Sequence, residues 1–387
     1  MKETEVLFAL LRSGITGETV SDEIQKACTE EMLEKVYYHA HRHDIAQVVG
    51  QALSKMQVPQ CEVAETFRKS AFMAFYRYGQ IKYDYERMCK TLEEGQIPFI
   101  PLKGSVIRDY YPEPWLRTSG DVDILVKTED LDRAVALLES KLQYRSHGKA
   151  AHDVVLTGMN GFFLELHFAL VQTPGKAKDI LDRVWEDAKP IAPGSYQYAL
   201  SNEMFCFYHL AHMAKHVRIG GSGIRTFMDL WIMGQKMQID TEKLTALLKQ
   251  GERLAFAREA GKLAQYWFCG EEPDQWTKIM ENFILAGKVY GSTENSVIIG
   301  QQLHGGGIRY MLHRIFMPYE QLKENFPILK KHKWLTPVYQ VVRWVRLIFL
   351  GRFSRSVREL STSAKITDET RENTYALIEH LGLDFKH

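Results

Sequence analysis

The run DVDILV (121–126) constrains the fold of this chain more than any other feature. Its apolar end predicts a buried β-strand, yet two carboxylates, Asp121 and Asp123, stand at its start. Because side chains alternate along a strand, both carboxylates should point to one face and the intervening apolar side chains to the other. Buried carboxylates are costly unless something compensates them. The run therefore predicts a strand with an apolar layer on one face and a bound cation or a solvated cleft on the other.

A small sheet is predicted around this strand. IPFIPL (97–102) is short, apolar and bounded by turn residues, which is typical of a strand. TEDLDRAVALLESKL (128–142) has helical spacing, with Thr128 as the expected N-cap. HDVVLTGMNGFFLELHFAL (152–170) contains two β-rich runs around Gly-Met-Asn-Gly, which indicates a hairpin. Together these segments predict a small mixed sheet with helices on one face.

Helical patterns flank this sheet on both sides. Apolar residues recur at three- and four-residue spacing in the first ninety residues, and the last of these helices is expected to end at Gly95. The same spacing returns at Ser201, which begins a capping-box pattern. We therefore expect an α+β protein with an N-terminal helical region (1–90), an α/β core (91–195) and a C-terminal helical domain (196–387).

Charge and cysteine content narrow the function classes. The formal net charge of the 387 residues is +1, so no global field steers the protein to nucleic acid, and processive polymer synthesis is not expected. Five cysteines at long spacings, without a CxxC motif, argue against a disulfide framework and a structural zinc site. The N-terminus lacks a signal-peptide pattern, and no stretch of 18 apolar residues occurs. A cytoplasmic location is expected.

The two aspartates are candidate metal ligands. A divalent cation removes their mutual repulsion, and Mg²⁺ prefers carboxylates together with substrate phosphate oxygens. A third carboxylate is expected from Glu165, which is flanked by leucines in LEL (164–166) and so faces out of the apolar layer. Solvated acids at a strand edge, or a cross-strand partner of a lysine in the case of Glu165, are the alternatives. The combination favours metal-assisted phosphoryl or nucleotidyl transfer.

A candidate phosphate site lies upstream, in PLKGSVIRDYY (101–111). A strand that ends in Lys103, Gly104 and Ser105 and leads into a helix presents backbone N–H groups to an anion. Lys103 and Arg117 are cations within reach of phosphates. Lys103 as a plain surface lysine, and Arg117 as an ion-pair partner of the aspartates, remain open alternatives.

These segments resemble a known family. LKGSVIRDYYPEPWLRTSGDVDILV resembles the DNA polymerase β-type nucleotidyltransferase superfamily and, within it, a bacterial family of uncharacterised nucleotidyltransferases. Members of that family carry an LKG start, an arginine shortly before the acids, and a D-[IV]-D-[IL]-L-V strand. The resemblance is most specific over 98–126 and extends to 151–170. Flanking helical regions are also usual in that family.

The resemblance implies a function and a set of roles. Asp121, Asp123 and Glu165 would ligate Mg²⁺ or Mn²⁺, and Glu165 would also deprotonate the acceptor. Gly104 and Ser105 would contact the β- and γ-phosphates. The implied activity moves a nucleoside monophosphate from an NTP, with ATP as the expected donor, to a hydroxyl or amine of a small-molecule or protein acceptor, releasing pyrophosphate. The alternative is a catalytically silent NTP- and Mg²⁺-binding regulatory or scaffold protein.

A histidine stripe follows in HLAHMAKHV (209–217). His209, His212 and His216 share one helix face, so His212, Lys215 and His216 are candidates to line the nucleotide cleft. A polar stripe packed against the α/β core is the alternative. A zinc site is not favoured, because no acid or cysteine accompanies the histidines at ligand spacing.

Two further features complete the sequence. Arg225 and Asp229, spaced i and i+4, are expected to form a structural ion pair. The segment 330–360 is basic and apolar. It is either a core helix with a charged outer edge or a helix that associates weakly with an anionic membrane surface.

Overall fold

The computed structural model describes residues 1–170, 175–289, 291–349 and 366–383. The chain divides into two compact units. One comprises Met1–Ala214 and Gly223–Thr277, and the other comprises Lys215–Ser222 and Lys278–His387. The three-part division drawn from the sequence stays a prediction.

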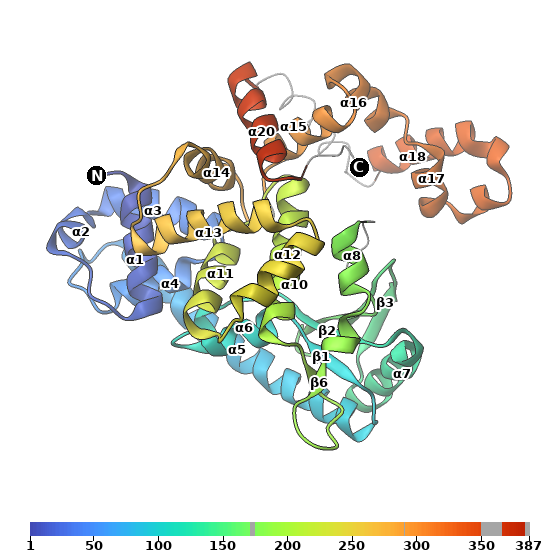
Figure 1. Ribbon diagram of the computed structural model, residues 1–387, viewed down its shortest axis with the longest axis horizontal. Coiled ribbons are helices and arrows are strands. Elements are labelled where there is room, and N and C mark those ends of the chain that lie inside the picture. The colour runs from blue at the N-terminus through green and yellow to red at the C-terminus, as the bar shows by residue number, and fades with distance from the viewer. Residues whose placement is uncertain (171–174, 290, 350–365, 384–387) are drawn as a thin grey trace. The chain divides into compact units, whose positions relative to one another are not determined.

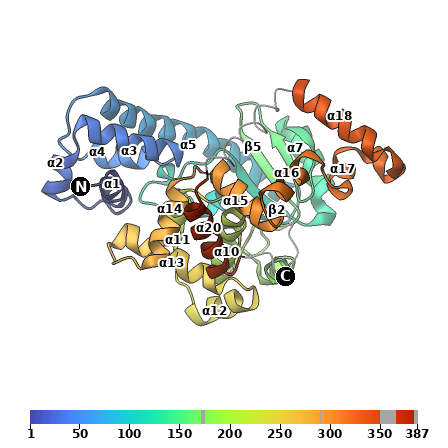
Figure 2. The same ribbon diagram turned by 90° about the horizontal axis from the view of Figure 1, so that it is seen from above.

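The first unit begins with a helical region, as the periodicity predicts, and the structure divides it into five helices. They are α1 (Glu3–Thr16), α2 (Asp22–Ala27), α3 (Glu30–Arg42), α4 (Ala46–Leu53) and α5 (Glu62–Glu94). Helix α5 ends at Gly95, as expected, and buries Phe67, Ile81 and Met88 along one stripe. Figure 2 shows α3 and α4 beside the N-terminal half of α5.

A five-stranded mixed sheet follows, in the order β1-β2-β5-β4-β3. Its strands are β1 (Phe99–Pro101), β2 (Val122–Val126), β3 (Arg145–Lys149), β4 (Asp153–Thr157) and β5 (Phe163–His167). Strand β1 is antiparallel to β2, β2 is parallel to β5, and β4 and β5 form the predicted hairpin. Strand β3 was not predicted, because RSHGK is exposed throughout and carries no apolar alternation.

Short helices connect these strands. Between β1 and β2 lie α6 (Gly104–Ile107) and the 3₁₀ turns η1 (Arg108–Tyr110) and η2 (Pro114–Leu116). After β2, one 3₁₀ turn, η3 (Thr128–Asp130), precedes α7 (Leu131–Leu142). The prediction of Thr128 as the N-cap is therefore wrong, since the chain makes this tighter turn before the α-helix begins.

One face of the sheet is the apolar face. Val122, Ile124 and Val126 of β2 pack with Leu164 and Leu166 of β5 in a buried cluster that also includes side chains of α5 and α7. Figure 1 shows α5 and α7 alongside the sheet. Residues that alternate with these apolar side chains must point to the opposite face. The carboxylates of Asp123 on β2 and Glu165 on β5 therefore lie on the face opposite the apolar cluster.

The remaining elements of the first unit are mostly helical. They are α8 (Lys176–Leu181), α9 (Val184–Asp187), the short strands β6 (Lys189–Pro190) and β7 (Tyr198–Ala199), α10 (Asn202–Arg218), α11 (Ile224–Lys236), α12 (Thr241–Gln250) and α13 (Leu254–Cys269). Helix α10 starts as predicted, with the Ser201 Oγ accepting a hydrogen bond from the Met204 amide at 3.2 Å. Its last residues, like those of α14 (Gln275–Leu285), belong to the second unit.

The second unit consists of helices. They are α15 (Thr293–Leu303), α16 (Gly307–Ile315), α17 (Tyr319–Asn325), α18 (Thr336–Phe349) and α20 (Asp368–His380), with the 3₁₀ turns η4 (Pro327–Lys330) and η5 (Lys333–Leu335). The basic, apolar segment 330–360 lies partly in α18, and its residues 350–360 lie outside the described part of the chain. Among the described helices, none has the length and hydropathy needed to cross a membrane.

Candidate active site

The parallel pairing of β2 and β5 brings two acids together. Asp123 of β2 lies directly opposite Glu165 of β5 in the register, so both side chains share the face away from the apolar cluster. Asp123 is almost completely buried, and a third of the Glu165 side chain is exposed. The expectation that the strand of Glu165 is a neighbour of 121–126 is confirmed.

A histidine completes the cluster. The Nε2 atom of His167 lies 2.8 Å from Asp123 Oδ1 and 3.4 Å from Glu165 Oε2. One donor atom from each of these three residues lies within 4.8 Å of the other two, which is close enough to hold one cation. Sequence reasoning missed His167. The sequence does carry a signal for it: Glu165 and His167 are two residues apart on β5, as Asp121 and Asp123 are, so both point to the same face of the sheet.

Asp121 lies beside this cluster rather than in it. It precedes the first residue of β2 and is not among the three residues whose donor atoms converge. Burial raises the pKa of Asp121, and the negative charge of Asp123 raises it further. The structure therefore brings Asp121 into the field of the cluster, while its role as a metal ligand stays a prediction.

Lys103 is part of the site. Its Nζ atom donates a hydrogen bond to Asp123 Oδ1 at 2.6 Å, and only a fifth of its side chain is exposed. Burial alone would raise the pKa of Asp123, but Lys103 and His167 together hold it well below its usual range. Asp123 is therefore ionised at neutral pH. The alternative that Lys103 is a plain surface lysine is therefore wrong.

The backbone at Lys103 is strained. Its φ of 43° and ψ of −120° lie in a region that favours glycine. A lysine in this conformation costs on the order of 1–3 kcal/mol, which the surrounding structure must offset. The ion pair with Asp123 is one contact that does so. Strain of this kind is concentrated at functional sites in proteins.

Gly104 and Ser105 have different surroundings from those that the sequence suggested. A Cβ atom on Gly104 would approach Arg117 Nη1 to 2.9 Å, so the glycine makes room for a buried guanidinium. The Ser105 amide donates to the Leu102 carbonyl at 3.1 Å. The structure does not bring Ser105 to the acid cluster, and its phosphate contact, like that of Gly104, stays a prediction.

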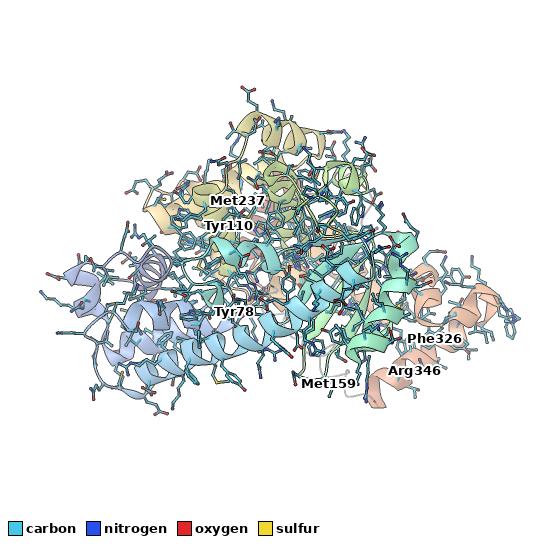
Figure 3. The ribbon with its side chains drawn as sticks, turned by 90° about the horizontal axis from the view of Figure 1, so that it is seen from below. Tyr78, Tyr110, Met159, Met237, Phe326 and Arg346 are labelled. Atoms are coloured by element: carbon cyan, nitrogen blue, oxygen red, sulfur yellow. The ribbon has the colours of Figure 1, made fainter. Side chains whose placement is uncertain are left out.

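Ser105 instead lines two cavities on the α5 side of the sheet. The larger is about 500 Å³ and is also lined by Tyr78 and Val122, a side chain of the apolar face. The smaller is about 250 Å³ and is lined by Tyr110 and Met237. Figure 3 labels Tyr78, Tyr110 and Met237. Because Val122 and Asp123 point to opposite faces of β2, the larger cavity lies on the other face of the sheet from Asp123.

Gly104→Ala should destabilise the protein. The added methyl group would meet the Arg117 guanidinium, which cannot move away because Asp229 holds it, so we expect a loss of about 1–3 kcal/mol. Chemical denaturation of both variants measures it. Gly79→Ala is the matched control, since a Cβ atom at that position in the middle of α5 would have no described atom within 4 Å apart from its chain neighbours and the backbone of its own helix. It should stabilise the protein by about 0.5–1 kcal/mol, and equal stability of the two variants would contradict the argument.

Arg117 forms a buried ion pair. Its guanidinium pairs with Asp229 at 2.9 Å, both side chains are at least nine-tenths buried, and the Tyr111 hydroxyl donates to the same carboxylate at 2.7 Å. The expected Arg225–Asp229 pair is therefore wrong, and so is the alternative that pairs Arg117 with Asp121 or Asp123. Contact of Arg117 with the nucleotide stays a prediction.

Arg225 forms a second tie. It donates to Asp44 Oδ2 at 2.6 Å and to the Thr118 carbonyl at 3.0 Å. Gln47 of α4 donates to the Leu116 carbonyl at 2.7 Å. Gln47 of α4 and Arg225 of α11 thus hold the loop that leads to Asp121. These contacts fix the position at which β2 begins and therefore the position of its carboxylates.

The predicted histidine stripe is divided between the two units of the chain, with His209 and His212 in the first and His216 in the second. His209 is buried and its Nε2 lies 3.1 Å from the Thr226 carbonyl oxygen, which matches the packed polar stripe. The His212 ring lies 6.1 Å from that of Tyr208, whereas Lys215 and His216 belong to the second unit. Nucleotide contacts by His212, Lys215 and His216 stay predictions.

Tyr208 is a buried tyrosine whose hydroxyl is influenced by the charges of the cluster, and the sequence did not single it out. It is buried on α10, and burial raises the pKa of its hydroxyl, as does the negative charge of Asp123 and Glu165, while Lys103 opposes that effect. Nothing in its local sequence distinguishes it from a core aromatic side chain on the same helix.

Comparison with known proteins identifies a family. A family model described as "Uncharacterised nucleotidyltransferase" matches residues 29–269, well over half of the chain. The matched span includes Lys103, the acid cluster and the buried Arg117–Asp229 pair. No curated protein and no solved structure shows significant similarity to the chain.

Proposed function

Because the chain belongs to the uncharacterised nucleotidyltransferase family, we propose that it moves a nucleoside monophosphate from an NTP, with ATP as the expected donor, to an acceptor, and releases pyrophosphate. The acceptor would be a hydroxyl or an amine of a small molecule or a protein. The observation that carries the proposal is the convergence of Asp123, Glu165 and His167 beside Lys103.

The three converging residues fit a divalent cation. Two carboxylates and an imidazole offer donor atoms at one point, and a bound cation would also offset the charge that raises the pKa of Asp121. Asp123, Glu165 and His167 would hold Mg²⁺ or Mn²⁺, and the imidazole favours Mn²⁺, because Mg²⁺ prefers oxygen ligands alone. The cation would supply charge stabilisation for phosphoryl oxygens.

The side chains of the chain divide the remaining work. Lys103 places an ammonium group at the cluster, suited to binding a phosphate oxygen. Glu165 is the most exposed of the three converging residues, so it is the one that can accept a proton from an incoming hydroxyl. Asp123 is too buried to meet the acceptor and instead holds Lys103 and His167 in place.

Glu165→Gln should weaken Mn²⁺ binding at least about tenfold, because a neutral amide replaces one of two anionic ligands. Calorimetric titration with Mn²⁺ measures the change. His152, Asp153 and His167 form a second group with converging donor atoms. Asp153→Asn is therefore the matched control and should leave the Mn²⁺ affinity unchanged. Loss of binding in Asp153→Asn but not in Glu165→Gln would place the metal in the second group.

Transfer itself is tested with α-labelled NTPs, Mg²⁺ or Mn²⁺, and a cell extract as the source of acceptors. Label should appear on an acceptor with stoichiometric pyrophosphate. Metal-dependent NTP binding by calorimetry, without pyrophosphate release on any acceptor, would instead support the silent regulatory or scaffold alternative. Absence of metal-dependent NTP binding would exclude both.

A further inference from the structure

Helix α16 exposes an apolar stripe. Ile308, Met311, Leu312 and Ile315 lie on one helix face at three- and four-residue spacing, and all four are exposed, with Ile308 at 79%. No side chain of α16 is buried. A stripe of four exposed apolar side chains on a helix with no fully buried residue marks an interaction surface.

Helix α18 and the turn before it continue the pattern. Val338, Val341 and Val345 share one face of α18, and each is about half exposed. Trp334, in η5, is 75% exposed. Tryptophan and branched aliphatic side chains are the residues that amphipathic helices insert at a lipid interface.

The two helices are fixed to each other within the second unit. The Arg343 guanidinium donates to the carbonyls of Arg314 and Ile315 at 3.0 Å, and the Trp344 Nε1 donates to the Ile315 carbonyl at 2.9 Å. The Arg346 guanidinium stacks over the Phe326 ring at 4.9 Å, and Figure 3 labels both residues. The apolar stripes therefore belong to one structured body.

The same segment is strongly basic. Residues 307–346 contain eight lysines and arginines and two glutamates, which is a net charge of +6. The whole chain carries +1, so the rest carries −5. The cations are Arg309, Arg314, Lys323, Lys330, Lys331, Lys333, Arg343 and Arg346.

The positive charge of residues 307–346 indicates which kind of partner this surface binds. Two copies docked face to face through these helices would bring like charges together, which is unfavourable. An anionic lipid surface complements the charge and accepts the apolar side chains. We propose that the face formed by α16, η5 and α18 binds the surface of an anionic lipid membrane. The proposal does not depend on nucleotidyl transfer.

The test is vesicle flotation of the full chain. Vesicles of phosphatidylcholine with about 30% phosphatidylglycerol should carry the protein, neutral phosphatidylcholine vesicles should carry much less, and high salt should release it. Replacing Lys330, Lys331 and Lys333 together by glutamine should weaken binding at least about tenfold. All three are exposed, so the variant should fold.

A second variant tests the apolar contribution. Ile308→Gln with Val341→Gln should also abolish flotation, whereas the control Phe72→Gln with Met159→Gln, at equally exposed apolar positions of the first unit, should not. Circular dichroism checks that each variant folds. Equal binding to neutral and anionic vesicles, or none to either, would overturn the proposal. Self-association that Ile308→Gln and Val341→Gln remove, without vesicle binding, would identify the face as a protein interface instead.

Discussion

Asp123→Asn is expected to lower nucleotidyl transfer by about a thousandfold or more while leaving the protein folded. The substitution keeps the shape of the side chain but removes the charge that faces Lys103 and His167. Without that charge the cluster loses an anionic ligand, and Lys103 loses the partner that fixes its position. Label transfer from an α-labelled NTP measures the effect.

Two controls separate loss of chemistry from loss of structure. Glu129→Gln removes one negative charge at an exposed position just after β2, and it should leave transfer unchanged. The far-ultraviolet circular dichroism of Asp123→Asn should match that of the unaltered protein. Equal labelling by Asp123→Asn and by the unaltered protein would refute the assignment of this acid to the active site.

Asp229→Ala is expected to cost about 3–5 kcal/mol of unfolding free energy. The carboxylate is fully buried and accepts hydrogen bonds from Arg117 and Tyr111, so its removal leaves a buried guanidinium without a counter-charge. Chemical denaturation measures the loss. The pair also joins the loop before β2 to helix α11, so activity should fall together with stability.

A double variant tests whether the cost comes from the uncompensated charge. Arg117→Leu with Asp229→Leu removes both partners and should be markedly more stable than Asp229→Ala alone. If the double variant were as unstable as the single one, loss of packing rather than of charge pairing would explain the effect.

The same carboxylate predicts an acid-sensitive contribution to stability. Burial alone would raise the pKa of Asp229, but Arg117 and its hydrogen bonds lower it below the ordinary 3.8. A group with a depressed native pKa stabilises the fold above its unfolded pKa, and that stability is lost as the pH falls through the native pKa. The stability difference between the unaltered protein and Asp229→Asn should therefore shrink below about pH 4.

Much of the core was predictable because its patterns are local. The apolar runs gave strands β1, β2, β4 and β5, and the turn residues between β4 and β5 gave the hairpin. The exposed strand β3 lacks such a pattern and was missed. The pairing of β2 with β5 was expected only because Asp123 and Glu165 were predicted to bind one metal ion. The observed register confirms that the two strands are neighbours.

Ion pairing was predicted less well. Arg225 and Asp229 are four residues apart on one helix, yet their partners are Asp44 and Arg117, more than a hundred residues away in the chain. Spacing along a helix brings two charges within reach, but burial determines which pairs must form, because an unpaired charge in the core is far more costly than one at the surface.

The sequence by itself determined that Asp123 and Glu165 face away from the apolar layer, since alternation along a strand is a property of the local backbone. Only the tertiary structure decided which basic side chains meet the buried acids: Lys103 and His167 at Asp123, and Arg117 at Asp229. That choice depends on distances between segments far apart in the chain, and no local pattern encodes them.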